Sequence, residues 1–162
     1  MLIDAGYFTK GDRQIQNSSA NPGIQNSYAV KAAIEGFIEE YQPVYLRDAV
    51  GEELAEQISG LVDVESGESS SDIDTLIEML REPFAEYVFF HMIRTNFEVA
   101  TIDGIVRLSN TNSPVSPLRA MVAAWGRMVD GHERMVEWAK DTSGISVKIQ
   151  KSMLEPLNSL NI

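Results

Sequence analysis

The amino-acid sequence predicts a mainly α-helical fold, a four- to five-helix bundle with a small β-hairpin before the last long helix. Two observations predict it: apolar residues recur at steps of three and four along most of the chain, and proline-containing or polar segments separate these runs. The length of 162 residues and the hydrophobic fraction of 44% suit a single helical domain over residues 1–162 with one buried core.

The first 25 residues are polar and contain many turn-forming residues, so we expect an extended N-terminal arm over 1–25. One short extended piece is predicted around Tyr7-Phe8. The residues alone allow two interpretations, a loosely ordered terminus or an arm that docks on another surface.

Residues 27–61 predict two helices that meet at a proline. Ser27 is a suitable N-cap, and Pro43 lacks the backbone N–H that a continuing helix needs, so we expect a corner at Gln42-Pro43. Gly51 costs about 1 kcal/mol relative to alanine in a helix, which indicates a bend or a close contact. The apolar stripes are Val30, Ile34, Phe37, Ile38 and Tyr41, then Leu46, Val50, Leu54, Ile58 and Leu61. The opposite face of the first helix carries Lys31, Glu35, Glu39 and Glu40.

An acidic, serine-rich segment over 62–72 predicts a loop before the third helix. Ser71 with Asp74 resembles a capping box that starts this helix, and Pro83 is expected to kink or split it. The run from Phe84 to Ile93 is apolar nearly all round, which predicts a helix that is central in the fold or covered by another subunit. A strand is the competing interpretation, because aromatic and β-branched residues favour strands.

The last third of the chain predicts a hairpin, a long helix and a tail. β-Branched residues flank Asp103-Gly104, which indicates a tight hairpin within 99–108. A long helix is predicted to start near Pro117 and to be ended by Asp141 to Gly144, and a short amphipathic C-terminal tail covers 145–162. The helix has a heptad seam of Leu118, Met121, Trp125, Met128, His132, Met135 and Ala139. Its methionines predict either ordinary core packing or an adaptable groove for a partner.

Few residues have the spacing that catalysis or metal binding needs. The two histidines, His91 and His132, lie in apolar stripes without a ligand partner one helical turn away, so we expect structural roles. The chain has no cysteines, which removes disulfides, thiolate nucleophiles and zinc–thiolate sites. It also has no nucleotide-binding, hydrolase or EF-hand motif. We therefore predict a protein that is not an enzyme, with no catalytic residues, no cofactor and no metal.

The chain is strongly acidic, with 13 lysines and arginines against 24 aspartates and glutamates and a net charge of −11. This balance argues against a phosphate-binding face, because nucleic-acid affinity comes largely from clustered basic side chains. The paired carboxylates Glu39-Glu40, Glu52-Glu53 and Asp72/Asp74 are expected on solvated surfaces. The N-terminus lacks a signal-peptide pattern and no long apolar window occurs, so we expect an intracellular protein without membrane contact.

One stretch of the chain resembles a known family. Residues 41–54 read YQPVYLRDAVGEEL, which resembles an E-P-x-Y-L-x-x-L-L-G-like run in head–tail connector (head-completion, neck) proteins of tailed phages and prophages of Bacteroides-type hosts. The stretches TIDGIV at 101–106 and YFTKG at 7–11 are also similar to that family. The chain departs from the pattern at Ala49-Val50, where two leucines are usual.

The resemblance implies a structural virion protein, a helical subunit that assembles as a homo-oligomeric ring between portal and tail. Its implied partners are the portal protein, a tail-completion protein and passing DNA, which it contacts without sequence-specific binding. Its implied location is the virion neck, or the host bacterial cytoplasm during assembly. An acidic ring lining agrees with this role, because repulsion keeps the genome sliding.

A closed ring needs a heterologous interface, in which two different patches meet. Our candidates for apolar contact are Tyr7, Phe8, Phe89, Phe90, Ile93, Met153 and Leu154. Our candidates for an acidic lumen or tail-facing element are Glu65, Glu68 and Asp72. The alternative function is a non-enzymatic binding or regulatory module that uses the methionine-rich seam as a groove.

Overall fold

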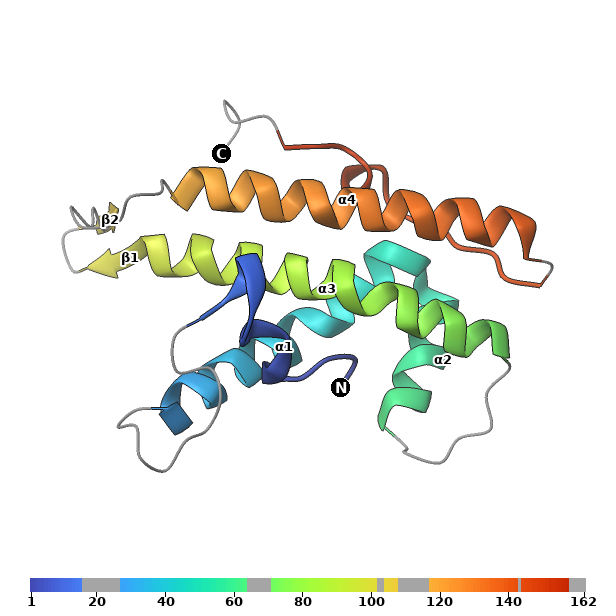
Figure 1. Cartoon of the computed structure of the whole chain (residues 1–162), viewed down its shortest axis with the longest axis horizontal. Coiled ribbons are helices and arrows are strands. Elements are labelled where there is room, and N and C mark those ends of the chain that lie inside the picture. The colour runs from blue at the N-terminus through green and yellow to red at the C-terminus, as the bar shows by residue number, and fades with distance from the viewer. Residues whose placement is uncertain (16–26, 64–70, 102–103, 108–116, 143, 158–162) are drawn as a thin grey trace.

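A computed structural model of the chain describes residues 1–15, 27–63, 71–101, 104–107, 117–142 and 144–157 (Figure 1). Within these ranges the fold is mainly helical, as predicted. The four α-helices are α1 (Ser27–Val50), α2 (Glu52–Asp63), α3 (Ser71–Phe97) and α4 (Pro117–Asp141). Helix α3 is central: α4 lies along one side of it, and α1 and α2 lie on the other.

The corner predicted at Gln42-Pro43 is wrong, because α1 continues through Pro43 to Val50. Pro43 removes one helical donor, that for the carbonyl of Glu39. Both residues are exposed, so water can reach this carbonyl and the helix tolerates the loss. The chain turns at Gly51 instead, where φ is +87° and the Gly51 N–H donates to the carbonyl of Arg47 at 3.0 Å. That is the left-handed glycine cap typical of helix C-termini.

Gly51 also makes the close contact that the sequence indicated. A Cβ added to it would lie 2.9 Å from the Cβ of Lys148 in the C-terminal tail. The Lys148 N–H donates to the carbonyl of Val50 at 3.1 Å, and the Gln150 N–H donates to that of Asp48 at 2.8 Å. The tail therefore satisfies carbonyls that the end of α1 leaves without helical donors.

Helix α3 runs through Pro83 without being split, and the helical interpretation of Phe84 to Ile93 is confirmed over the strand. Pro83 is buried and faces Gly131 of α4. A Cβ on Gly131 would overlap the Pro83 ring, so glycine is what lets α4 approach α3 at this point.

The start of the N-terminal arm is packed rather than extended. The extended piece predicted at Tyr7-Phe8 is wrong, since Ala5–Phe8 and Gly11–Arg13 form short 3₁₀ turns, η1 and η2. The side chain of Asp4 caps η1 by accepting from the Gly6 N–H at 2.7 Å. The aromatic pair suggested a strand, but here its packing against the helices decides the conformation. Residues 16–25 of the predicted arm lie outside the described residues.

Two short strands follow α3, in the segment where the sequence predicts a hairpin. Strand β1 (Glu98–Thr101) pairs antiparallel with β2 (Gly104–Arg107), with Thr101 opposite Gly104. The connecting residues 102–103 lie outside the described residues. The tail contains one further 3₁₀ turn, η3 (Lys151–Met153).

The heptad seam of α4 forms part of the core. Its buried members are Met121, Met128, His132 and Met135. The interpretation of this seam as ordinary core packing is confirmed. The methionines of this seam, Met121, Met128 and Met135, are buried within the chain.

Candidate functional site

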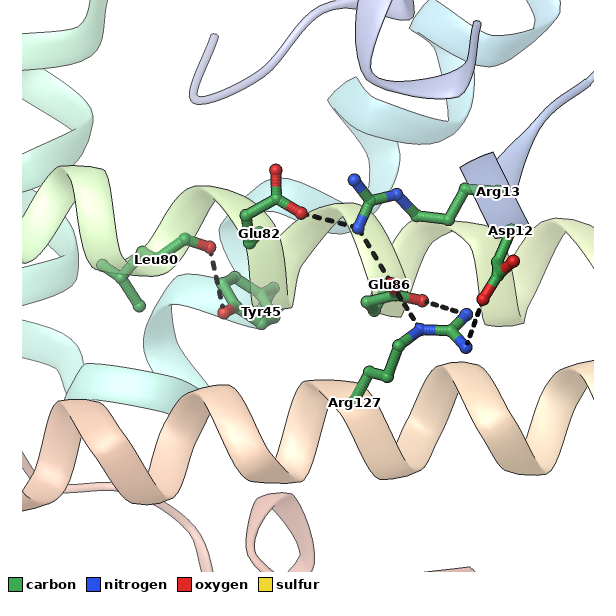
Figure 2. A network of polar contacts seen from close by, with 7 residues as sticks. All are labelled: Asp12, Arg13, Tyr45, Leu80, Glu82, Glu86 and Arg127. Atoms are coloured by element: carbon green, nitrogen blue, oxygen red, sulfur yellow. Dashed lines mark hydrogen bonds and ion pairs between the residues drawn. The ribbon is translucent and has the colours of Figure 1, made fainter. Parts of the chain in front are cut away.

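The most extensive charged arrangement among the described residues surrounds Glu86 of α3, a side chain that is only 6% exposed (Figure 2). Arg127 of α4 donates to it through Nε at 2.8 Å and Nη2 at 2.9 Å, a bidentate contact. Arg13 of the arm donates through Nη1 at 2.8 Å. The hydrogen bond to Glu86 raises the pKa of Arg127. One buried carboxylate thus joins the arm, α3 and α4.

Two more carboxylates complete what we name the Glu86 cluster: Glu86, Arg13, Arg127, Glu82 and Asp12. Arg13 pairs with Glu82 at 2.7 Å and Arg127 with Asp12 at 3.5 Å (Figure 2). The side chains of Glu82 and Asp12 are 62% and 84% exposed, so these outer pairs contribute little to stability. The charged groups of the cluster form ion pairs with each other. This arrangement suits a structural contact between the arm, α3 and α4 better than a ligand-binding site.

Sequence reasoning missed Glu86 as a junction. A signal was present, because Glu86 is the single acidic residue in the apolar run from Phe84 to Ile93. A lone carboxylate at such a position indicates a buried charge that needs a cationic partner.

The second polar arrangement is the His132 cluster, which comprises His132, Tyr45 and the carbonyls of Leu80 and Met153. His132 Nδ1 lies 3.0 Å from the Met153 carbonyl, and Nε2 lies 2.9 Å from the Tyr45 hydroxyl. A carbonyl only accepts, so we infer that Nδ1 carries the proton and that Nε2 accepts from Tyr45. The Tyr45 hydroxyl also lies 3.3 Å from the Leu80 carbonyl (Figure 2).

Burial keeps this second cluster neutral. His132 and Tyr45 have no exposed surface. Desolvation lowers the pKa of His132, against the raising effect of its hydrogen bond to Met153. Burial likewise raises the pKa of Tyr45. His132 is therefore a core histidine that ties α4 to α1 and to the tail, in agreement with the predicted structural role.

His91 has a different setting, an aromatic stack at the α1–α3 contact. Its ring lies 4.2 Å from that of Tyr41, stacked, and 4.5 Å from that of Tyr87, edge-on. Burial, with Arg94 nearby, lowers the pKa of His91 to about 4. Neither histidine belongs to a group of three or more metal-ligating side chains within the described ranges.

Most of the predicted apolar contact residues are packed within the chain itself. Phe8 and Met153 are 0% and 3% exposed, and Phe89 and Phe90 are 9% and 5% exposed. The remaining three, Tyr7, Ile93 and Leu154, are half-buried. In this conformation the seven residues offer little area to a partner.

The predicted acidic element is only partly described. Asp72 is half-buried in the first turn of α3. Glu65 and Glu68 lie outside the described residues, so the lumen or tail-facing role stays a prediction.

A surface that sequence reasoning missed is the outer side of α1. Tyr28 is 61% exposed and Val44 is 38% exposed. The exposed positions between them are small in the first half, at Ala29, Ala32, Ala33 and Gly36, and include the carboxylates Glu39 and Glu40 in the second half. The polar face expected there is narrower, because Lys31 and Glu35 are half-buried and pair with each other at 3.3 Å. The signal in the sequence was the run of alanines and glycine opposite the apolar stripe.

A hollow of about 370 Å³ opens beside the arm. It is lined by Asp4, Gly6, Tyr7, Thr9, Lys10, Arg13 and Glu82. Arg13 and Glu82 pair with each other in this lining, so a carboxylate already neutralises part of the charge that an anionic ligand would meet.

Comparisons of this chain with family models, curated proteins and solved structures found no match. Among the helices described, none combines the length and the apolar character needed to cross a membrane.

Proposed function

We propose that this chain is a structural virion protein, a head–tail connector subunit that forms a ring between portal and tail. The resemblance of residues 41–54 to connector proteins supports this function, and the mainly helical fold agrees with it. The single observation that carries the proposal is the outer side of α1, from Tyr28 to Val44.

The outer side of α1 has the character of a protein contact. Exposed tyrosine is typical of interface anchors, and apolar surface of this kind often marks sites of association. A Cβ added to Gly36 would meet no other atom within 4 Å, so a neighbouring backbone has room to approach closely there. In a ring, this side of α1 meets a different patch on the next subunit.

The charge distribution supports a channel for DNA. Exposed carboxylates follow each other along α2 at Glu52, Glu53 and Glu56. A ring that turns such surfaces inward repels the phosphate backbone and keeps DNA mobile.

The test is assembly of the purified chain, alone and with a portal protein, followed by solution mass measurement and negative-stain imaging. We expect closed rings at high concentration or on the portal. Tyr28→Glu should abolish them, because it places a charge in the interface. The matched control Gln57→Glu adds the same charge at an exposed position of α2 and should leave rings intact.

Circular dichroism of both variants checks that the helices persist. A chain that stays strictly monomeric with and without the portal would contradict the connector function. Rings that survive Tyr28→Glu would keep the function but remove α1 from the interface.

A further inference from the structure

The N-terminal arm, here residues 1–15, is held to the helices by buried apolar side chains, by charged pairs and by the backbone N–H of Leu2. We propose that in the assembled ring the arm of each subunit docks on the helices of the next subunit, in the site that it occupies within its own chain here. This inference rests on the proposed ring. The occupant of each docking site is then the arm of a second copy of this chain.

The apolar part of the site is filled by the arm. Leu2, Ile3 and Ala5 are each 3% exposed and Phe8 is fully buried. The Leu2 N–H donates to Oε1 of Gln42 on α1 at 2.5 Å. An arm that left would uncover apolar surface on the helices, so the site favours an occupied state.

The charged part of the site fixes the register of the arm. Arg13 meets Glu82 and Glu86 of α3, while Asp12 meets Arg127 of α4. The arm thus supplies a cation beside an anion, and the helices supply the opposite charges. A segment of another protein would need an acidic and a basic residue at the same sequence spacing from four apolar residues. The arm of a second copy of this chain has this spacing because its sequence is the same.

An exchanged arm makes the same contacts as an arm docked within its own chain. The two states therefore differ in chain connection and association entropy. In dilute solution the tether gives the chain's own arm an effective concentration of about a millimolar, which favours internal docking. In a ring the arm of the neighbouring subunit is also held close to the docking site, so the advantage of the chain's own arm in effective concentration becomes smaller. Residues 16–26 join the arm to α1, and a segment of this length reaches at most about 40 Å.

The absence of cysteines makes exchange measurable by cross-linking. Lys10 of the arm and Glu82 of α3 line the same hollow, so one cysteine is placed on the arm and the other on the helix that it contacts. A chain carrying Lys10→Cys is mixed in equal amounts with a chain carrying Glu82→Cys under ring-forming conditions, and a short bis-maleimide is added. We expect a covalent dimer that contains one chain of each kind, in a yield that rises with ring formation.

Two controls bound this yield. The double variant, Lys10→Cys with Glu82→Cys in one chain, should cross-link internally when dilute, which shows that the positions are in reach. A mixture of Lys10→Cys with Asp141→Cys measures random encounters, because residue 141 lies 14 residues beyond Arg127 on α4, about 21 Å along the helix.

Rings with no dimer above this background would overturn arm exchange and leave the connector function standing. A dimer above background without rings would contradict the ring and, with it, exchange between ring neighbours. The absence of both rings and dimer at the highest concentration would overturn both proposals.

Discussion

The Glu86 cluster and the His132 cluster both place polar groups among packed helices, but they differ in charge and in access to water. Glu86 is a buried carboxylate that pairs with two arginines, Arg13 and Arg127. Exposed carboxylates in turn pair with these arginines at the surface. His132 and Tyr45 are fully buried and share hydrogen bonds without any nearby pairing charge. The first arrangement depends on every partner being present. The second arrangement depends on His132 staying neutral, so the two should respond differently to mutation and to pH.

The largest effect is expected for Glu86→Gln. The change keeps the volume but leaves two guanidiniums around a neutral amide, so we expect the free energy of unfolding to fall by about 3 kcal/mol. Chemical denaturation followed by circular dichroism measures it. Glu78→Gln is the control, since Glu78 is exposed and pairs with Arg81 at 3.0 Å. Equal losses in the two variants would show that the Glu86 cluster behaves as a surface pair.

The second effect is a loss of stability in acid. The unfolded chain binds a proton at the ordinary histidine pKa of 6.5, whereas burial lowers the pKa of folded His91 to about 4. Stability is therefore present above pH 6.5 and is lost as pH falls toward 4. Because His91 is only half-buried, we expect about 1–2 kcal/mol from it after solvent screening.

Denaturation of the wild type and of His91→Leu at pH 7 and pH 4.5 isolates this effect. The variant should lose less stability on acidification than the wild type. Identical losses would show that His91 takes up no proton on unfolding. The pKa of His132 is lowered by burial in the same direction, so His132 should account for part of the remaining loss.

A smaller effect is expected for Tyr45→Phe. Without the hydroxyl, Nε2 of His132 has no donor in its buried site, and we expect a loss of about 1 to 2 kcal/mol. Tyr28→Phe is the matched control, because that tyrosine is 61% exposed and its hydroxyl is free to bond with water. Thermal unfolding of the two variants should separate them by several degrees.

The smallest effect belongs to the rim of the Glu86 cluster. Asp12→Asn removes a 3.5 Å pair with Arg127 at a side chain that is 84% exposed. We expect a change below about 0.5 kcal/mol. A loss near that of Glu86→Gln would show that the rim and the centre of the cluster act as one unit.

The helices could be predicted from the sequence because their apolar stripes are long and regular. The corner could not, since Pro43 and Gly51 are both helix breakers on local grounds. Pro43 faces solvent, where one lost hydrogen bond is tolerated, and Gly51 meets the tail, which follows it by about a hundred residues. Only the packing of the whole chain decides between them.

The site was less predictable than the fold. Apolar residues such as Phe89 and Phe90 are contact candidates from the sequence because their helix is apolar all round, yet both are buried in the folded chain, where Phe90 packs against Trp125 of α4. The outer side of α1 is predicted to carry four charged residues; Glu39 and Glu40 are exposed there, whereas Lys31 and Glu35 are half-buried at its flank. Burial by distant segments separates core from surface, and periodicity within one helix does not report it.

The hydrogen bonds from the tail to the end of α1 have a consequence for the order of folding. The side chains of Asp48 and Gln150, 102 positions apart, also bond at 2.7 Å beside these backbone contacts. During synthesis the turn at Gly51 therefore leaves the ribosome about a hundred residues before its partners on the tail. The end of the first helix must wait, with its terminal carbonyls bonded to water, until these later residues have emerged and can close the contact.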